Sequence, residues 1–144
     1  MSNRFDDKVM VVTGAAQGIG LTVATRAATE GAKLVIVDQS DHVFKIAEIL
    51  KSRGTEVVAV VSDLETAEGA QQAIDAAINS FGRLDILINN VGGTIWMQPY
   101  ASYTPEQIQK EVQRSLFPTL WCCHAALPAM LNNKRGAIVN VSSV

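Results

Sequence analysis

Three glycines early in the chain have the spacing of a phosphate-binding turn. The segment from Val9 to Gly20 reads VMVVTGAAQGIG, so an apolar, β-rich run breaks at Gly14 and a helical pattern follows. Free backbone N–H groups at a helix start bind phosphate oxygens. Gly14 permits the turn, Gly18 permits close approach of a pyrophosphate, and Gly20 lets the helix pack tightly on the sheet. The segment therefore predicts a dinucleotide-binding loop, formed by Gly14, Ala16, Gln17, Gly18, Ile19 and Gly20.

An acidic residue, Asp38, ends the second apolar run at the distance expected for a ribose-binding carboxylate. A carboxylate there accepts hydrogen bonds from an adenosine ribose and repels a 2′-phosphate. The neighbouring positions 15–17, 39 and 40 hold no lysine or arginine. We therefore expect NAD rather than NADP as the cofactor. The alternative is that Asp38 only caps the helix that follows.

Strands and helices alternate along the chain and bring these residues to strand ends. The apolar runs and breakers predict strands at 8–13, 33–38, 55–61, 84–89 and 136–142. They predict helices at 17–30, at 41–53 after a cap at Ser40 or Asp41, at 66–81 and at 104–132, the last kinked at Pro118. Thr104 and Gln107 are expected to form a capping box at the start of that last helix.

This order predicts an α/β fold, a Rossmann-type doubly wound parallel sheet in three αβα layers. Residues 1–144 are expected to form one NAD(P)-binding domain that is incomplete at its C-terminus, because such folds usually have a sixth strand. Without that strand, the fifth strand is an exposed edge that favours association.

Composition excludes several classes of partner. The net charge is −2, from 12 basic and 14 acidic side chains, so we expect no nucleic-acid partner. No apolar run is long enough to span a membrane, and the first residues are polar, so a cytoplasmic location is expected. The adjacent Cys122 and Cys123 suit small buried side chains, and no metal site is predicted.

Several strand-end sequences together resemble the short-chain dehydrogenase/reductase family. They are Thr-Gly-x3-Gly-Ile-Gly at 13–20, Asn-Asn-Val-Gly at 89–92, where the family usually has alanine at 91, and Asn-Val-Ser-Ser at 140–143. The resemblance implies that Asp63 and Leu64 meet the adenine ring, and that Asn90, Val91 and Gly92 form the floor beneath the cofactor ribose. It implies that Ser143, rather than Ser142, is the catalytic serine, and that the parent protein is a homotetramer acting on a small molecule.

Two catalytic features depart from that family. Its members use a Tyr-x-x-x-Lys pair, in which the lysine lowers the tyrosine pKa so that a phenolate accepts the alcohol proton. No lysine of this chain has a tyrosine four residues before it, so the 144 residues alone are expected to be inactive. Ser115 stands where the family often has an asparagine that holds a proton-relay water, and we assign it that role. The alternative is a helix hydroxyl bonded to its own backbone.

The loop at 92–100 and the segment at 114–123 resemble family members that oxidise a cis-dihydrodiol carboxylate formed from benzoate. Their products are catechol, CO2 and NADH. Gly93, Thr94 and Trp96 follow a strand end and are expected to line the substrate pocket, although Trp96 could instead anchor the loop. No residue is an evident clamp for the substrate carboxylate. Two further hypotheses are a non-catalytic or vestigial nucleotide-binding module and a dehydrogenase of the same family for another alcohol or ketone.

Overall fold

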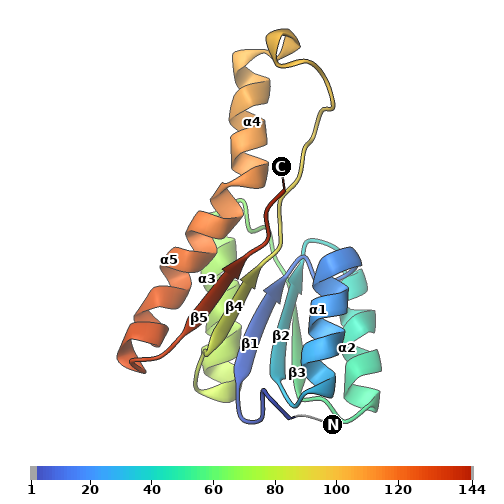
Figure 1. Cartoon of the computed structure of the whole chain (residues 1–144), viewed down its shortest axis with the longest axis vertical. Coiled ribbons are helices and arrows are strands. Elements are labelled where there is room, and N and C mark those ends of the chain that lie inside the picture. Colours follow the sequence, from blue (N-terminus) through green and yellow to red (C-terminus); the bar gives the residue numbers. More distant parts are fainter. Residues whose placement is uncertain (1–2, 144) are drawn as a thin grey trace.

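A five-stranded parallel sheet forms the centre of the computed structural model, which describes residues 3–143 (Figure 1). The strands are β1 (Val9–Thr13), β2 (Lys33–Asp38), β3 (Val57–Val61), β4 (Ile86–Asn89) and β5 (Ala137–Asn140). Their order across the sheet is β3-β2-β1-β4-β5, and every neighbouring pair is parallel. The predicted doubly wound α/β fold is therefore confirmed, and the order reverses between β1 and β4.

Helices cover both faces of the sheet and make three layers. Helices α1 (Gly18–Thr29) and α2 (His42–Ser52) pack on one face, and α3 (Ala67–Phe81) and α5 (Phe117–Asn132) pack on the other. The residues of β1 alternate between the two cores: Val9 and Val11 face α3 and α5, and Met10 and Val12 face α1. Burial on both faces explains the continuous apolar runs of the central strands.

The glycine turn fixes the start of α1 against the sheet. Gly14 has φ +63°, which favours glycine, and the chain leaves β1 there. A Cβ on Gly20 would lie 2.1 Å from the Gly14 carbonyl oxygen, so only glycine allows the helix to approach the turn this closely. These are the roles that the sequence predicts for the first and third glycines.

The single helix predicted over 104–132 was wrong, because the structure has two. Helix α4 (Pro105–Ser115) ends before Leu116, and α5 begins at Phe117. Pro118 lies in the first turn of α5. Backbone N–H groups in the first turn have no partner within the helix, so a proline there costs no hydrogen bond and starts a helix rather than kinking one. The predicted capping box of Thr104 and Gln107 is confirmed. Figure 1 shows α4 extending beyond the carboxyl ends of the strands.

Within residues 3–143, β5 pairs only with β4 and is largely exposed, as predicted for an edge strand. It is shorter than predicted, ending at Asn140 before Val141, Ser142 and Ser143 continue past the sheet. No helix in the described part of the chain is long and apolar enough to cross a membrane.

Candidate dinucleotide-binding and active site

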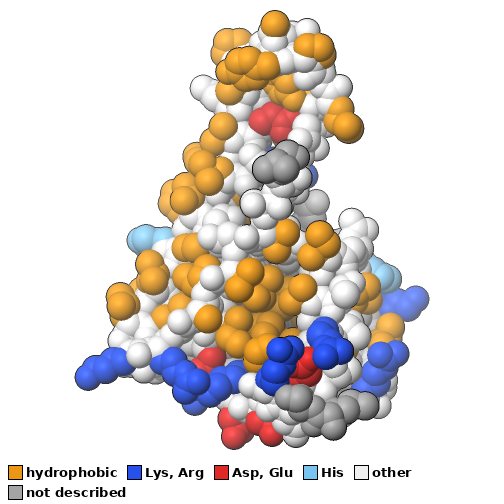
Figure 2. All heavy atoms as spheres, viewed as in Figure 1, with side chains coloured by type: hydrophobic (Ala, Val, Ile, Leu, Met, Phe, Trp, Pro, Cys, Tyr) orange, Lys and Arg blue, Asp and Glu red, His pale blue; other side chains and the backbone are white. Residues whose placement is uncertain are grey.

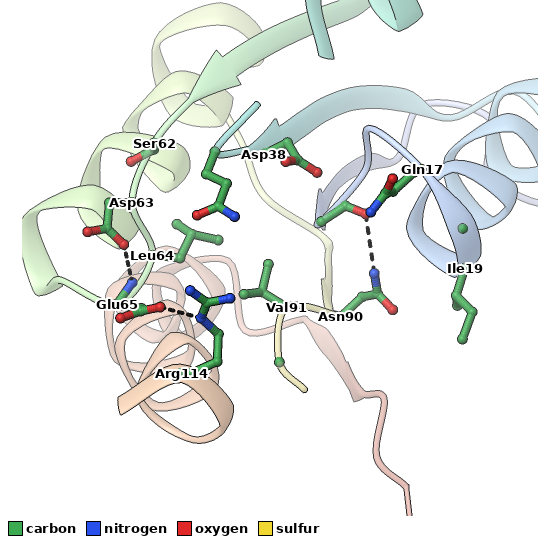
Figure 3. Close-up of a pocket in the computed structure, with 14 residues that line it drawn as sticks. Gln17, Ile19, Asp38, Ser62, Asp63, Leu64, Glu65, Asn90, Val91 and Arg114 are labelled. Atoms are coloured by element: carbon green, nitrogen blue, oxygen red, sulfur yellow. Dashed lines mark hydrogen bonds and ion pairs between the residues drawn. The ribbon is translucent and has the colours of Figure 1, made fainter. Parts of the chain in front are cut away.

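A pocket of about 360 Å³ opens where the strand order reverses, at the carboxyl ends of the strands (Figure 3). Such crevices are where open α/β sheets bind their ligands. Ten of the twelve predicted cofactor-binding residues line it: Gly14, Gln17, Gly18, Ile19, Asp38, Asp63, Leu64, Asn90, Val91 and Gly92. Gln39, Ser62, Glu65 and Arg114 complete the wall. The other two predicted residues, Ala16 and Gly20, are buried behind the glycine turn.

The glycine-loop end of this pocket suits a pyrophosphate. Gln17 is the N-cap of α1 and its side chain makes no capping hydrogen bond, and the first turn holds no acidic residue. Apart from the adjoining residues and the backbone of α1, no atom lies within 4 Å of the position that a Cβ on Gly18 would take, so the backbone is open to a ligand there. A helix N-terminus with an open approach and no carboxylate of its own favours a bound anion. The residues present therefore fit a dinucleotide cofactor.

Asp38 links the glycine loop to the turn after β2. Its Oδ2 accepts a hydrogen bond from the Ala16 N–H at 2.9 Å, and its Oδ1 accepts one from the Ser40 N–H at 3.0 Å. Ala16 thus acts through its backbone rather than by lining the pocket. The helix α2 itself is not capped by Asp38: its N-cap is Asp41, and the His42 N–H donates to the Ser40 hydroxyl. Asp38 therefore shapes the loop and presents a carboxylate to the pocket.

Thr13 and Asn90 join the ends of β1 and β4 beneath the pocket. The buried Thr13 hydroxyl accepts hydrogen bonds from the N–H groups of Asn90, at 2.9 Å, and Val91, at 3.2 Å. Asn90 Nδ2 donates to the Gly14 carbonyl at 3.3 Å. Asn89 Nδ2 donates to Asn140 Oδ1 at 2.9 Å and so joins β4 to β5. Thr13 was not among the predicted site residues, although a threonine inside an apolar strand end was a usable signal.

Arg114 and Glu65 form a part of the pocket that the sequence did not indicate. The Arg114 Nε donates to Glu65 Oε1 and forms an ion pair between α4 and the loop after β3. Figure 3 shows the guanidinium pointing into the pocket, between Glu65 and Val91. The two residues lie far apart in sequence, and nothing local predicts that they meet.

A second cavity of about 700 Å³ adjoins the first and shares Val91 and Gly92 with it. It brings together the predicted catalytic residues Ser115 and Ser143 with the predicted substrate residues Gly93 and Thr94. Ser142 also lines the cavity, so position alone does not separate it from Ser143. Tyr100, Tyr103, Ile108 and Val112 supply much of the remaining wall.

Trp96 does not line either cavity and packs edge-on against Tyr103, with ring centroids 6.4 Å apart. The arrangement agrees with the alternative of a loop anchor. The Ser115 hydroxyl donates a hydrogen bond to the Glu111 carbonyl of the preceding helical turn. This structure therefore has the alternative arrangement for Ser115, in which the hydroxyl bonds to the backbone of its own helix. Ser115 still lines the second cavity.

Glu111 holds the loop between β4 and α4. Its carboxylate accepts hydrogen bonds from the N–H groups of Ile95, at 3.0 Å, and Trp96, at 2.9 Å, and from the Tyr103 hydroxyl at 3.1 Å. The Trp96 N–H and then the Ile95 N–H lower the pKa of Glu111, although partial burial opposes them. Burial and the nearby Glu111 charge raise the pKa of Tyr103. Glu111 was not predicted as a site residue.

Cys122 is fully buried, as predicted, and burial raises its pKa to about 12, so it is a thiol at neutral pH. Cys123 is half-buried and accepts a hydrogen bond from Asn89. Among residues 3–143, no three histidine, cysteine or acidic side chains gather as a metal site would require.

The sheet order, the glycine turn and the carboxylate after β2 together define a Rossmann-type α/β fold. The chain belongs to the short-chain dehydrogenase family, whose model matches residues 8–144.

Two curated relatives carry the same name, 1,6-dihydroxycyclohexa-2,4-diene-1-carboxylate dehydrogenase. The protein of Pseudomonas putida is 55% identical over 144 residues, which are 100% of this chain and 53% of the relative. The protein of Acinetobacter baylyi is 52% identical over 143 residues, or 99% of this chain and 55% of the relative. The chain thus spans about half the length of these relatives.

Solved structures share the fold over a similar extent. An NAD+-bound xylitol dehydrogenase matches with a TM-score of 0.91 at 28% identity, covering 97% of this chain and 54% of the other. A 7α-hydroxysteroid dehydrogenase complexed with NADH matches with a TM-score of 0.91 at 27% identity, covering 99% of this chain and 55% of the other. The solved structures that share this fold therefore include dehydrogenases with bound NAD+ or NADH.

Proposed function

We propose that this chain is the cofactor-binding part of an NAD-dependent dehydrogenase that oxidises a cis-dihydrodiol carboxylate, the diol of benzoate, in the breakdown of aromatic compounds. One observation supports the choice of NAD above the others: the Asp38 carboxylate lies in the glycine-loop pocket, where it would repel a 2′-phosphate. The names of relatives 52% and 55% identical to the chain support the substrate class.

When bound, NAD supplies the hydride acceptor. In this proposal Gly14, Gln17, Gly18 and Ile19 hold the pyrophosphate at the start of α1, and Asp38 binds the adenosine ribose. Asp63 and Leu64 meet the adenine. Asn90, Val91 and Gly92 support the ribose nearest the second cavity, since Asn90 lines the first pocket and Val91 and Gly92 line both cavities.

The second cavity takes the diol, with Gly93 and Thr94 in its wall. In the proposed reaction the carbon that bears the secondary hydroxyl loses a hydride, and the hydroxyl proton goes to a base, which leaves a ketone. That ketone is β to the carboxylate, so CO2 leaves readily and the ring aromatises to catechol. The Ser143 hydroxyl holds the substrate oxygen during the transfer, and Ser115 is proposed to support proton relay beside it. In the part of the chain that the structure describes, no cationic side chain lines this cavity.

The proton-accepting base is proposed to lie in a further part of the parent protein. The 144 residues contain no Tyr-x-x-x-Lys pair, and the chain spans about half of its relatives. We therefore propose that this chain alone transfers no hydride and binds NAD weakly. The parent enzyme is proposed to work as a homotetramer in the cytoplasm.

A non-catalytic nucleotide-binding module is the second candidate. The hydrogen bond from the Ser115 hydroxyl to the Glu111 carbonyl favours it, because that hydroxyl is then engaged away from any relay. A gene whose reading frame stops after Val144 and is stably expressed would support this candidate. An open frame that encodes Tyr-x-x-x-Lys a short way on would support the dehydrogenase.

The deciding experiment pairs calorimetry with an assay of the parent enzyme. The chain is titrated with NAD and with NADP, and NADH formation by the full-length protein is followed with the benzoate diol and with simple secondary alcohols. We expect NAD to bind more tightly than NADP, and the diol to be turned over fastest. Tighter NADP binding would refute the cofactor assignment. Equal turnover of simple alcohols would indicate a dehydrogenase of the same family with another substrate.

A further inference from the structure

Among residues 3–143, Arg114 is the cationic side chain in the wall of the first pocket, which also holds the carboxylates of Asp38, Asp63 and Glu65. It projects from the last turn of α4, and its Nε is paired with Glu65, a partner on a different element that restrains the guanidinium. Its side chain is 37% exposed and forms part of the wall of the pocket.

The surroundings of Arg114 differ from those of the glycine loop. Leu64, which is 3% exposed, and Val91 form an apolar surface beside the guanidinium (Figure 3). Gln17 and Ile19, at the start of α1, lie on the far side of the pocket in Figure 3, beyond Asp38. A planar cation beside aliphatic side chains matches a flat aromatic ring, since guanidinium groups stack on such rings and Leu and Val pack against them.

We propose that Arg114 closes the nucleobase end of the pocket and stacks on the adenine ring, with Glu65 holding its guanidinium in the stacking orientation. This inference rests on the proposed function, because it takes the first pocket as the dinucleotide site. Arg114 is then a specificity residue for an aromatic base and acts on cofactor affinity, separately from the residues that hold phosphate and ribose.

The competing role for Arg114 is recognition of a phosphate group. The wall of the pocket argues against it, because three carboxylates outnumber the one guanidinium and Glu65 already neutralises that cation. A neutral ring meets no repulsion from those carboxylates, whereas a second phosphate does.

The test is a titration of the 144-residue chain, followed by NMR chemical shifts, which detect weak binding. The probes are 5′-AMP, ribose 5-phosphate, which lacks the base, and adenosine 2′,5′-bisphosphate, which adds a phosphate. Arg114→Met keeps an apolar side chain and removes the planar guanidinium, and Arg114→Lys keeps the positive charge without the planar group. Glu65→Gln removes the negative charge of the partner. Lys110→Met is the matched control, because it removes an exposed cation of the same helix.

We expect Arg114→Met to weaken 5′-AMP binding roughly fivefold and to leave ribose 5-phosphate binding unchanged. Glu65→Gln should weaken 5′-AMP binding by a smaller factor, and Lys110→Met should have no effect. Thermal unfolding of each variant checks that the fold is retained, and Glu65→Gln tests the same pairing if Arg114→Met does not fold.

Equal affinity of Arg114→Met and the original chain for 5′-AMP would overturn the stacking role and leave the dinucleotide site standing. Full retention of affinity by Arg114→Lys would show that charge suffices and would also overturn stacking. Tighter binding of the 2′,5′-bisphosphate, lost in Arg114→Met, would assign Arg114 to a phosphate instead. No binding of 5′-AMP at 10 mM or so would refute both the stacking role and the proposed dinucleotide site in this chain.

Discussion

Asp38 is the residue on which cofactor choice depends. Both of its carboxylate oxygens accept backbone hydrogen bonds, from Ala16 and Ser40, so its negative charge is held in place at the pocket. Replacing it with asparagine keeps the size and removes the charge that opposes a 2′-phosphate. We expect Asp38→Asn to narrow the preference for NAD over NADP roughly tenfold, which is about 1.4 kcal/mol.

Calorimetric titration of both dinucleotides measures this ratio. Asp75→Asn is the control, because Asp75 is an exposed residue of α3 that bonds only its helical neighbour Gln71 in the described contacts. An unchanged ratio in Asp38→Asn would mean that the carboxylate serves only the loop, through the Ala16 N–H.

Individual residues could be predicted where their partners are close in sequence. The glycines and Asp38 belong to one strand-turn-helix-strand unit, so their spacing alone placed them at the pocket. Glu111 and Arg114 depend on contacts between α4 and distant loops, and no periodicity or spacing encodes those contacts. The same limit explains Trp96, whose packing against Tyr103 depends on the path of the whole loop.

At the scale of elements, the loop from Gly93 to Tyr103 and helix α4 form a unit that one carboxylate holds together. The Glu111 carboxylate accepts hydrogen bonds from two backbone N–H groups and one hydroxyl of that loop. We expect Glu111→Ala to release the loop, because the Ile95 and Trp96 amides lose their acceptor. Hydrogen exchange at those two amides should accelerate at least tenfold, which corresponds to about 1.4 kcal/mol of lost protection.

Glu48→Gln is a suitable comparison for Glu111→Ala, because Glu48 pairs with Lys51 on the remote helix α2. Exchange at Ile95 and Trp96 should be unaltered in that variant. If both amides exchange at the original rate in Glu111→Ala, then other contacts, such as Gln98 with Gln107, hold the loop.

Asp85 joins the starts of three strands at the opposite end of the sheet. Its buried carboxylate accepts hydrogen bonds from the Val9 N–H and from Arg83, and its carbonyl accepts one from the Ala137 N–H. Burial alone would raise the pKa of Asp85, but Arg83 and the Val9 N–H outweigh it and lower the pKa below its ordinary value. The ionised form therefore stabilises the folded chain.

We expect Asp85→Asn to lower the free energy of unfolding by about 1–2 kcal/mol at pH 7. A depressed pKa contributes stability above the unfolded value, near 4, and loses it as the pH falls through the folded value. The difference between the two proteins should therefore shrink below about pH 4. Urea unfolding at pH 7, 5 and 3.5 measures it, with Asp75→Asn as an exposed control. A difference in the free energy of unfolding that stays constant with pH would contradict a stabilising role for the ionised Asp85 carboxylate.

The order of the elements could be predicted almost completely, and their ends less well. Apolar runs and glycine stops give the strands and helices, because those signals are local. The division of the long helix at Leu116 was missed, since Pro118 is compatible both with a kink and with the first turn of a new helix. The aromatic rings of Phe117 and Trp121 pack with their centroids 5.7 Å apart. Their positions depend on tertiary packing, so they could not be predicted from local signals.

For the whole molecule, the decisive feature is the part of the sheet that α1 and α2 do not cover. Figure 2 shows hydrophobic side chains gathered over this region beside α1. Val139, 49% exposed, pairs in register with Ile88 of β4, and Val141, 41% exposed, follows β5. An exposed strand edge beside an apolar face is a surface on which another chain can add.

We therefore expect this chain to self-associate in a concentration-dependent manner, and Val139→Lys to reduce that association. A lysine on an edge strand opposes strand addition because its charge would be desolvated between two chains. Sedimentation velocity over a hundredfold range of concentration measures the effect. Ile49→Lys is the matched control, since Ile49 is an apolar residue, 39% exposed, on α2 and away from the sheet edge. A monomer at every concentration, or equal association of the Val139→Lys and Ile49→Lys variants, would show that the β5 edge does not drive assembly.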